Sequence, residues 1–269
     1  MTEIQALILG IVQGLTEFLP VSSSGHLLIF ERLFNVNTES MLTLNVLLHA
    51  GTLLAVVVVY WGRLWNMVLH PIRSELKWLV LATIPTVIAA LLIDFDAAFE
   101  GDFIGASYLL TTMILMFAQA VSKVRKENKM LHREVRWYDA LGMGLLQALA
   151  ILPGVSRSGS TLAAGVTTGL SRKRAADFAF LMSVPAILGS MVLELKDVLL
   201  GDAEAIITVG ATPTLIAVAA AAVSGFIAIK FMLAIIRKIS LNWFALYTFL
   251  LGSFLLINRY IYPILPMGI

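Results

Sequence analysis

Apolar residues form long runs along this chain, and the runs predict membrane-crossing helices. A helix needs about 20 apolar residues to cross the hydrocarbon core of a bilayer. Six runs reach or approach that length: Met41–Tyr60, Trp78–Ile93, Phe103–Val121, Ala175–Leu193, a window within Ala205–Met232, and Leu241–Ile257. We predict that each of the six is a transmembrane helix.

Two further apolar stretches are interrupted near their middles by helix-breaking residues. Thr2–Phe30 contains Pro20 followed by three serines, and Ala140–Leu170 contains Pro153 followed by a Ser/Gly-rich segment. Irregular backbone at membrane depth is tolerated only where it is buried in protein or lines a wet cavity. Both stretches are therefore predicted to be re-entrant helix-loop-helix hairpins.

The two interrupted stretches also resemble each other. Gln13–Gly25 reads QGLTEFLPVSSSG, and Gln147–Gly159, 134 residues later, reads QALAILPGVSRSG, with six of thirteen positions identical. Each half of the chain then holds one hairpin and three spans, and an odd number of spans turns the second copy upside down. The sequence predicts an all-α membrane protein with six transmembrane helices plus two re-entrant hairpins in an inverted-topology repeat. It would form a single integral membrane domain over residues 1–269, with repeat 1 at about 1–134 and repeat 2 at about 135–269.

Composition supports a lipid environment and excludes several other classes of protein. The chain is 59% hydrophobic and 13% charged, whereas an ordinary soluble domain is roughly 25% charged. Such a chain is neither a soluble globular protein nor a disordered one. The absence of cysteine excludes a disulfide framework and a cysteine nucleophile, and a net charge of +2 is too small to favour nucleic acid as a partner.

Basic residues orient the predicted spans. They gather in segments 63–77, 123–136, 172–174 and 237–238, which all fall on one side of the predicted topology, while acidic residues occupy loops around 94–102 and 194–204 on the other. Short basic loops face the cytoplasm. Both termini are then expected on the outer face of a cytoplasmic membrane.

The first hairpin carries polar groups that suit an anion site. Gln13 and Glu17 are four residues apart and share one helix face. A Ser/Gly turn at the start of the next helix offers unpaired N–H groups and the positive end of the helix dipole, which together bind phosphate. The residues of this turn are Ser22, Ser23, Ser24, Gly25 and His26. The alternatives are that the serines simply cap the helix, that Glu17 is a satisfied polar group of the bundle, and that His26 hydrogen-bonds a carbonyl.

The second hairpin carries an arginine among hydroxyl groups. Arg157 is surrounded by Ser156, Ser158, Gly159, Ser160 and Thr161. Guanidinium binds phosphate in a bidentate manner, and an arginine at membrane depth is costly without a function. If the hairpins meet, they place a carboxylate, an imidazole, hydroxyls and a cation in one pocket. This set suits phosphoryl transfer.

These two motifs resemble those of a known family. Gln13–His26 matches the pattern (E/Q)GxxEFxPVSSxGH, and Pro153–Thr161 matches PGxSRSGxT. In these motifs, and in its length and span count, the chain is similar to the bacterial undecaprenyl-diphosphate phosphatases of the bacitracin-resistance (BacA/UppP) type. The resemblance implies hydrolysis of undecaprenyl diphosphate to undecaprenyl phosphate and inorganic phosphate. That reaction recycles the lipid carrier for peptidoglycan synthesis and gives bacitracin resistance, in the inner membrane with the site opening to the periplasmic face.

The resemblance also assigns roles to residues. It implies catalytic roles for Glu17, Ser23, His26 and Arg157, and phosphate-binding roles for Gln13, Ser22, Ser24, Gly25, Ser156, Ser158, Gly159, Ser160 and Thr161. The family is associated with Mg²⁺ or Ca²⁺, but Gln13 stands where other members have Glu. With Glu17 as the one available carboxylate, an ion arriving with the diphosphate is expected rather than a tightly held one. No organic cofactor is expected.

The sequence leaves the mechanism open. Ser23 is the candidate nucleophile, with His26 as its base or as the acid for the leaving phosphate, and Glu17 either orients His26 or activates water. A phosphoserine intermediate and direct attack by water are both compatible with these residues, and so is a homodimer. The alternative class is a transporter or flippase of the polyprenyl phosphate carrier, because inverted repeats with broken helices are typical of transporters.

Overall fold

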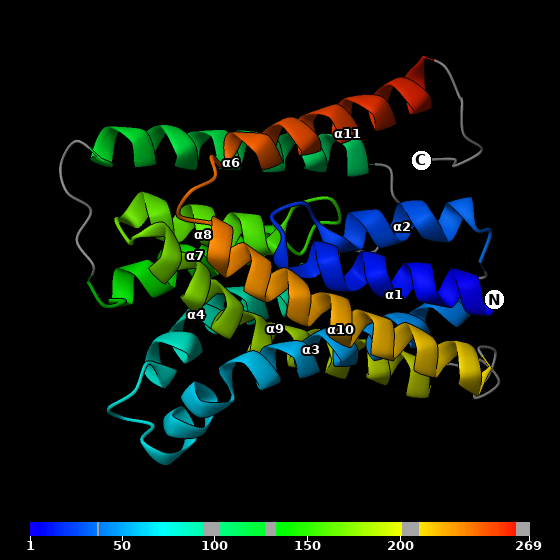
Figure 1. The fold of residues 1–269 in the computed structure, drawn as a ribbon, viewed down its shortest axis with the longest axis horizontal. Helices are drawn as coiled ribbons and strands as arrows, with labels where there is room; N and C mark the ends of the chain where they lie inside the picture. Colours follow the sequence, from blue (N-terminus) through cyan, green and yellow to red (C-terminus); the bar gives the residue numbers. More distant parts are fainter. Residues whose placement is uncertain (37, 94–102, 127–132, 201–209, 262–269) are drawn as a thin grey trace.

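The described part of the protein is built from α-helices joined by turns and loops. The computed structural model describes residues 1–36, 38–93, 103–126, 133–200 and 210–261, and within these ranges it contains helices and no strands (Figure 1). The helices are α1 (Glu3–Phe18), α2 (Ser23–Leu33), α3 (Thr38–Leu69), α4 (Leu76–Leu92), α6 (Ile104–Lys126), α7 (Trp137–Leu149), α8 (Arg157–Thr168), α9 (Arg172–Leu200), α10 (Ala211–Ile235) and α11 (Asn242–Tyr260).

Each of the six predicted spans corresponds to one helix. Within the described residues, four helices contain segments long and apolar enough to cross a membrane: Leu44–Leu69 in α3, Ile104–Val124 in α6, Arg172–Val192 in α9 and Ala211–Ile235 in α10. α4 is apolar but shorter, and the sixth predicted span lies on α11. The acidic loop positions 94–102, 202 and 204 lie outside the described residues.

The first predicted span ends too early. Hydropathy placed its end at Tyr60, but α3 continues to Leu69 with a kink at Tyr60, where φ is −107° and ψ is 15°. The Tyr60 hydroxyl donates a hydrogen bond to Asp177 of α9 at 2.9 Å. Helical backbone bonds continue past the apolar run because they do not depend on side-chain polarity.

The two interrupted stretches each form a pair of neighbouring helices. α1 contacts α2, and α7 contacts α8. After α1, Leu19 adopts extended backbone directly before Pro20, which disfavours further helix. Before α8, Gly154 has a φ of +90°, and a Cβ there would lie 2.7 Å from Cβ of Ser107. Only glycine fits this second turn without strain.

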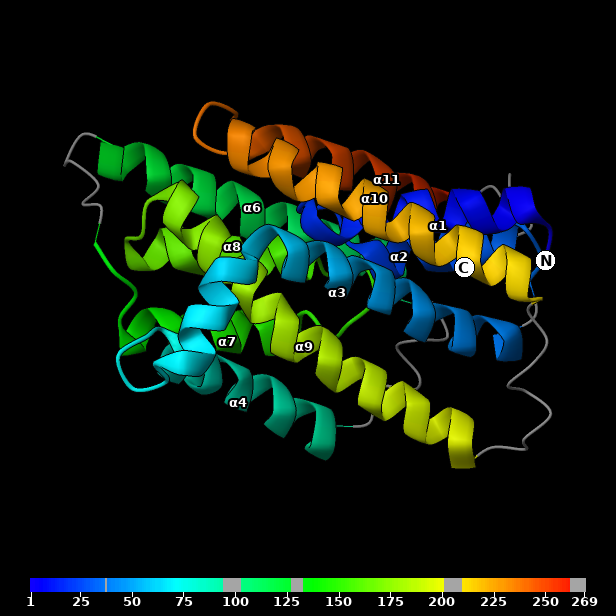
Figure 2. The same cartoon turned by 60° about the horizontal axis from the view of Figure 1, so that its bottom comes forward.

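The arrangement of the helices brings the two turns into the interior of the bundle. α8 contacts α6, α7, α9 and α1, whereas α6 and α11 pair along one edge (Figures 1 and 2). On the other side, α1 packs on α10, α10 on α3, and α3 on α9. The segments between α1 and α2 and between α7 and α8 are therefore covered by neighbouring helices.

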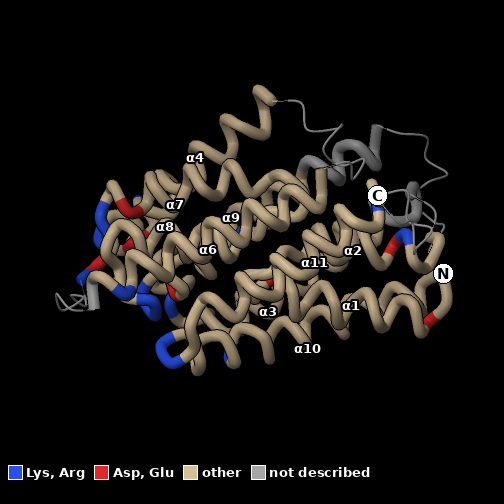
Figure 3. Tube along the Cα trace, turned by 90° about the horizontal axis from the view of Figure 1, so that it is seen from above, with Lys and Arg blue, Asp and Glu red and all other residues tan. Residues whose placement is uncertain are grey.

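Polarity is distributed as expected for a protein in lipid. Large apolar side chains are exposed along the helices, including Leu92, Leu215 and Trp243, while Gln13, Glu17 and other polar side chains are buried. An exterior this apolar matches a hydrocarbon solvent. Most Lys and Arg residues gather at one end of the bundle, and the N-terminus lies at the other (Figure 3). This placement agrees with the charge-based prediction that the basic loops share one side.

A buried ion pair closes the basic end of α7, and its loss should destabilise the protein. Arg133 donates to both carboxylate oxygens of Asp139, at 2.5 and 2.8 Å, and to the carbonyl of Thr168 at 3.1 Å. We expect Asp139→Asn to lower the free energy of unfolding by about 1–3 kcal/mol, because the partly exposed guanidinium loses its partner. Thermal denaturation in detergent measures this, with the exposed neighbour substitution Glu134→Gln as the matched control.

The same pair gives a pH dependence. Burial alone would raise the pKa of Asp139, but hydrogen bonds from Arg133, Thr168 and the Arg136 backbone outweigh burial and hold the pKa below its ordinary value. A lowered native pKa means that the stabilisation is complete above about pH 4 and is lost as pH falls through the native pKa. The difference in melting temperature between wild type and Asp139→Asn should therefore shrink on acidification. A difference that grows on acidification would contradict this assignment.

Candidate active site

The two turns meet through an ion pair and a hydrogen bond. The guanidinium of Arg157, at the start of α8, forms an ion pair with Glu17, near the end of α1. One residue further along, the Ser158 hydroxyl donates to the carbonyl of Leu19 at 2.7 Å. The prediction that the two motifs converge, although 140 residues separate Glu17 from Arg157, is thus confirmed.

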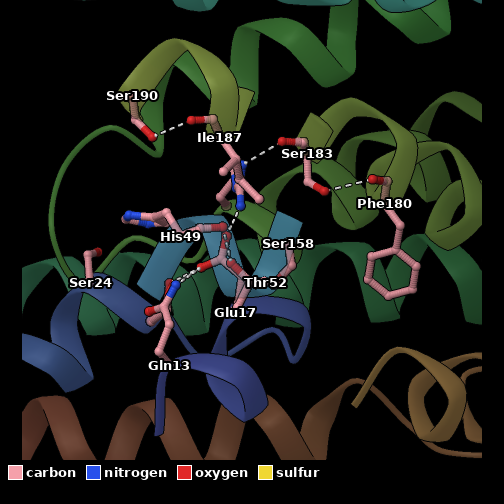
Figure 4. Close-up of polar contacts among 12 residues, drawn as sticks. Gln13, Glu17, Ser24, His49, Thr52, Ser158, Phe180, Ser183, Ile187 and Ser190 are labelled. Carbon is pink, nitrogen blue, oxygen red and sulfur yellow. Dashed lines mark hydrogen bonds and ion pairs between the residues drawn. The ribbon is translucent and has the colours of Figure 1, made fainter. Parts of the chain in front are cut away.

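The Glu17 carboxylate is the centre of the cluster. Its Oε1 faces Arg157, and its Oε2 accepts hydrogen bonds from the Ser23 hydroxyl and from the Gln13 amide, the latter at 3.3 Å (Figure 4). The Glu17 side chain is only 3% exposed. A carboxylate so deeply buried requires the arginine as its counter-ion.

Arg157 connects the cluster to α9. Its second terminal nitrogen donates to the carbonyl of Ser183 at 3.4 Å, and its side chain is 22% exposed. Ser23 and Ser158 are likewise partly exposed, and Ser24 is exposed. The cluster therefore has a buried carboxylate and an accessible rim of hydroxyl groups and guanidinium. A ligand can reach the cluster from the side of this rim.

The serines divide between capping and the cluster. Ser22 and Ser156 are the N-caps of α2 and α8, and their hydroxyls accept from the Gly25 and Gly159 N–H groups at 3.4 and 3.0 Å. The capping interpretation is correct for these two residues. Ser23 instead donates to Glu17. Ser22 has a φ of 69°, an unusual and strained backbone conformation that is typical of functional turns.

Two of the predicted phosphate ligands are buried in α8. Ser160 and Thr161 are buried, and the Thr161 hydroxyl donates to the Arg157 carbonyl one turn back at 2.8 Å. That geometry is the ordinary i–4 bond of a helical threonine. Among the described residues, the Ser160 hydroxyl has no hydrogen-bond partner.

His26 hydrogen-bonds groups other than Ser23, for which it was one candidate base. Its Nδ1 lies 2.6 Å from the Ser22 carbonyl and 2.9 Å from the Tyr108 hydroxyl, and its Nε2 lies 2.6 Å from the Tyr247 hydroxyl. A carbonyl only accepts, so Nδ1 carries a proton, and Nε2 of the neutral ring accepts from Tyr247. No hydrogen bond joins His26 to Ser23 within the described chain. The hydrogen-bonded partner of Ser23 is Glu17, and His26 makes the hydrogen bond to a carbonyl that was one of its predicted alternatives.

The two tyrosines were missed by sequence analysis. Tyr108 lies on α6 and Tyr247 on α11, 82 and 221 residues from His26, so no local pattern connects them. The Tyr247 ring stacks on the imidazole with centroids 5.7 Å apart, and Tyr108 meets its edge at the same separation. Together they fix the position of the imidazole.

We expect Tyr247→Phe to lower turnover modestly. The change keeps the stacked ring and removes one hydrogen bond to the imidazole, which is worth about 0.5–1.5 kcal/mol. If His26 acts as the acid for the leaving phosphate, kcat should therefore fall about 2–10-fold with KM unchanged. Steady-state kinetics measure this, with Tyr260→Phe, exposed on the same helix, as control. Unchanged kcat for Tyr247→Phe and for His26→Ala would remove the imidazole from the mechanism.

The residues present do not build a metal site by themselves. No group of three His, Asp or Glu side chains that could hold a metal ion occurs within the residues described. Near Glu17, the Gln13 Oε1 atom is buried without a hydrogen-bond partner among the described residues. One carboxylate already paired with Arg157 and one neutral amide fall short of the six or more oxygen ligands that Ca²⁺ or Mg²⁺ takes.

Fold and site together define a helical membrane protein with an acid–serine–arginine cluster suited to a phosphate group. The chain belongs to the family described as bacitracin resistance protein BacA, which it matches over residues 6–254. It is 39% identical over 263 residues to an undecaprenyl-diphosphatase of Carboxydothermus hydrogenoformans, covering 96% of this chain and 97% of the relative. It is also 38% identical to an undecaprenyl-diphosphatase of Halothermothrix orenii, covering 94% and 96%, and 38% identical to undecaprenyl-diphosphatase 3 of Bacillus cereus, covering 97% and 98%.

Proposed function

We propose that the protein hydrolyses undecaprenyl diphosphate to undecaprenyl phosphate and inorganic phosphate. The observation that supports this most directly is the contact of Glu17 with both Ser23 and Arg157 inside an apolar bundle. A carboxylate, a hydroxyl and a guanidinium are the groups that phosphoryl transfer requires. An apolar exterior next to a polar cluster suits a substrate with a polyprenyl tail and a diphosphate head.

Arg157 exchanges its partner when substrate binds. Its guanidinium moves from Glu17 to the terminal phosphate, where it neutralises the charge of the transferred group. The Glu17 carboxylate is then free to act as a base. The exposed Ser24 supplies a further hydroxyl donor to the phosphate oxygens.

Ser23 is the nucleophile in this proposal, supported by its hydrogen bond to Glu17. Its oxygen attacks the terminal phosphorus while Glu17 accepts its proton and passes it to the bridging oxygen, so the bond from that oxygen to the terminal phosphorus breaks and undecaprenyl phosphate leaves. Water, deprotonated by Glu17, then attacks the phosphorus of the phosphoserine. The bond from phosphorus to the Ser23 oxygen breaks, Glu17 returns the proton to that oxygen, and inorganic phosphate leaves. Direct attack by water activated by Glu17 gives the same products.

We further propose the inverted repeat with six spans and two re-entrant hairpins. The packing supports it, because α1 contacts α10 while α7 contacts α4, so the first helix of each half packs on the fourth helix of the other. Gly10 approaches the Ala217 carbonyl of α10, and Gly144 approaches the Ala82 carbonyl of α4. In this arrangement the protein lies in the bacterial inner membrane, with the basic end in the cytoplasm and the site open to the periplasm.

A divalent ion, in this proposal, enters with the diphosphate. Gln13→Glu should place a second carboxylate beside Glu17 and create a protein ligand set, so activity should need a lower concentration of Mg²⁺ or Ca²⁺ for half-maximal rate. Metal titration of phosphate release measures this, with Gln5→Glu, near the start of α1, as control. An unchanged metal requirement would mean that position 13 does not contribute to metal binding.

The experiment that tests the function is phosphate release by detergent-solubilised protein. With undecaprenyl diphosphate as substrate, a phosphatase produces inorganic phosphate without any membrane. A flippase of the polyprenyl phosphate carrier produces none, and only moves lipid between leaflets of a vesicle. Absence of phosphate release by folded protein would therefore refute the proposal.

A further inference from the structure

A polar pocket lies at the basic end of the bundle, away from the Glu17 cluster. Its volume is about 450 Å³. Four arginines line it, Arg63, Arg73, Arg133 and Arg174, against two glutamates, Glu75 and Glu134. The concentration of blue at this end is visible in Figure 3. An excess of guanidinium groups around a pocket favours an anion.

Part of this charge is compensated within the protein. Glu75 is shared between Arg63 and Arg174, each of which forms an ion pair with it, and Arg133 is paired with Asp139. Arg73 is exposed and has no ion pair within the described chain. Glu75 therefore serves two guanidiniums, and the pocket lining carries four guanidinium groups against two carboxylates, so a positive excess remains.

An apolar groove adjoins this pocket. It has a volume of about 740 Å³ and lies among α3, α4 and α9. Met67 lines both the groove and the polar pocket, and Leu76 of the groove follows Glu75 directly. Trp61 and Trp65 stack on each other at its edge, with 60% and 54% of their surfaces exposed. Exposed tryptophans are typical of the membrane interface.

We propose that pocket and groove together bind an anionic phospholipid from the leaflet at the basic end. Arg73, Arg63 and Arg174 hold its headgroup phosphate, and one acyl chain fills the groove along α4. Charge complementarity selects an anionic over a zwitterionic headgroup. A substrate molecule with its diphosphate at Arg157 could reach the basic pocket only with its hydrocarbon tail, which carries no charge for the arginines. A bilayer phospholipid offers a phosphate to the polar pocket and an acyl chain to the apolar groove, and is therefore the proposed occupant.

Lipid retention by the purified protein tests this site. Native mass spectrometry with phosphatidylglycerol and phosphatidylcholine of identical acyl chains should show preferential retention of phosphatidylglycerol. Arg73→Gln should lower that retention about fivefold, because the attraction between one basic side chain and an anionic lipid surface corresponds to about that change in affinity. Val87→Trp, which fills the groove, should lower retention of both lipids.

Two control variants distinguish loss of the proposed lipid site from general effects of changing charge or side-chain size. Arg237→Gln removes an exposed charge outside the pocket, and Val223→Trp enlarges an exposed side chain of α10 outside the groove. Both should retain phosphatidylglycerol as wild type does. Equal retention of the two phospholipids by wild type, or equal losses in test and control variants, would overturn the proposal. Stronger retention of undecaprenyl phosphate than of phosphatidylglycerol would overturn the choice of occupant.

Discussion

Arg157→Lys should reduce kcat/KM for undecaprenyl diphosphate by about a thousandfold. Arginines that neutralise a transferred phosphoryl group contribute roughly 10³–10⁵ to turnover. Lysine keeps the charge but lacks the planar fork that reaches both Glu17 and the Ser183 carbonyl. Because the charge is retained, the buried Glu17 keeps a counter-ion and the protein should still fold. Phosphate release in detergent, with the melting temperature measured in parallel, provides the test.

Arg172→Lys is the matched control for this experiment. Arg172 also makes several hydrogen bonds, to Ser122 at 3.1 Å, to the Ile239 carbonyl at 2.8 Å and to Gln119 at 2.8 Å, but it lies at the start of α9 and away from the cluster. Its replacement should lower stability and leave kcat close to that of wild type. If Arg157→Lys retained more than a tenth of wild-type kcat/KM, the guanidinium would have no direct role in phosphoryl transfer.

Hydropathy predicted the positions of the helices well because a segment that crosses lipid must be apolar along most of its length. Trp78–Ile93 was predicted where α4 covers Leu76–Leu92, and Leu241–Ile257 where α11 covers Asn242–Tyr260. Hydropathy failed at the end of α3, where Arg63 lies in helix and forms an ion pair with Glu75. A polar residue ends an apolar run in the sequence, but a helix ends only where its backbone bonds end.

The site was predictable where its residues lie in recognisable turns. Glu17, Ser23 and Arg157 were predicted to meet because proline and Ser/Gly segments interrupt two apolar stretches, and a polar break in lipid must be covered. The hydrogen-bond partner of Ser23 was not predicted: it is Glu17, whereas His26 was one candidate for its base. His26 is nearby in sequence, but its ring nitrogens are held by the Ser22 carbonyl, Tyr108 and Tyr247. Packing of distant helices decides such contacts, and no spacing along the chain encodes it.

Glu17→Gln should lower kcat by about 10²–10⁴-fold, the usual contribution of a general base, with a smaller change in KM. The amide can still accept a hydrogen bond from Ser23, but it cannot take its proton. Steady-state phosphate release measures the loss. Glu3→Gln, on the exposed first turn of the same helix, is the matched control and should behave as wild type. Full activity of Glu17→Gln would show that the carboxylate only balances the charge of Arg157.

Ser23→Ala then separates the two routes that share Glu17. If a phosphoserine forms, Ser23→Ala should lose nearly as much activity as Glu17→Gln, and acid quenching of wild type with terminally labelled substrate should leave label on Ser23. The double variant should be little worse than either single one, because residues that act as one unit are not additive. If water attacks directly, Ser23→Ala keeps most of its activity while Glu17→Gln does not, since the carboxylate activates the nucleophile in both routes. The ratio of the two single losses therefore identifies the atom that attacks phosphorus.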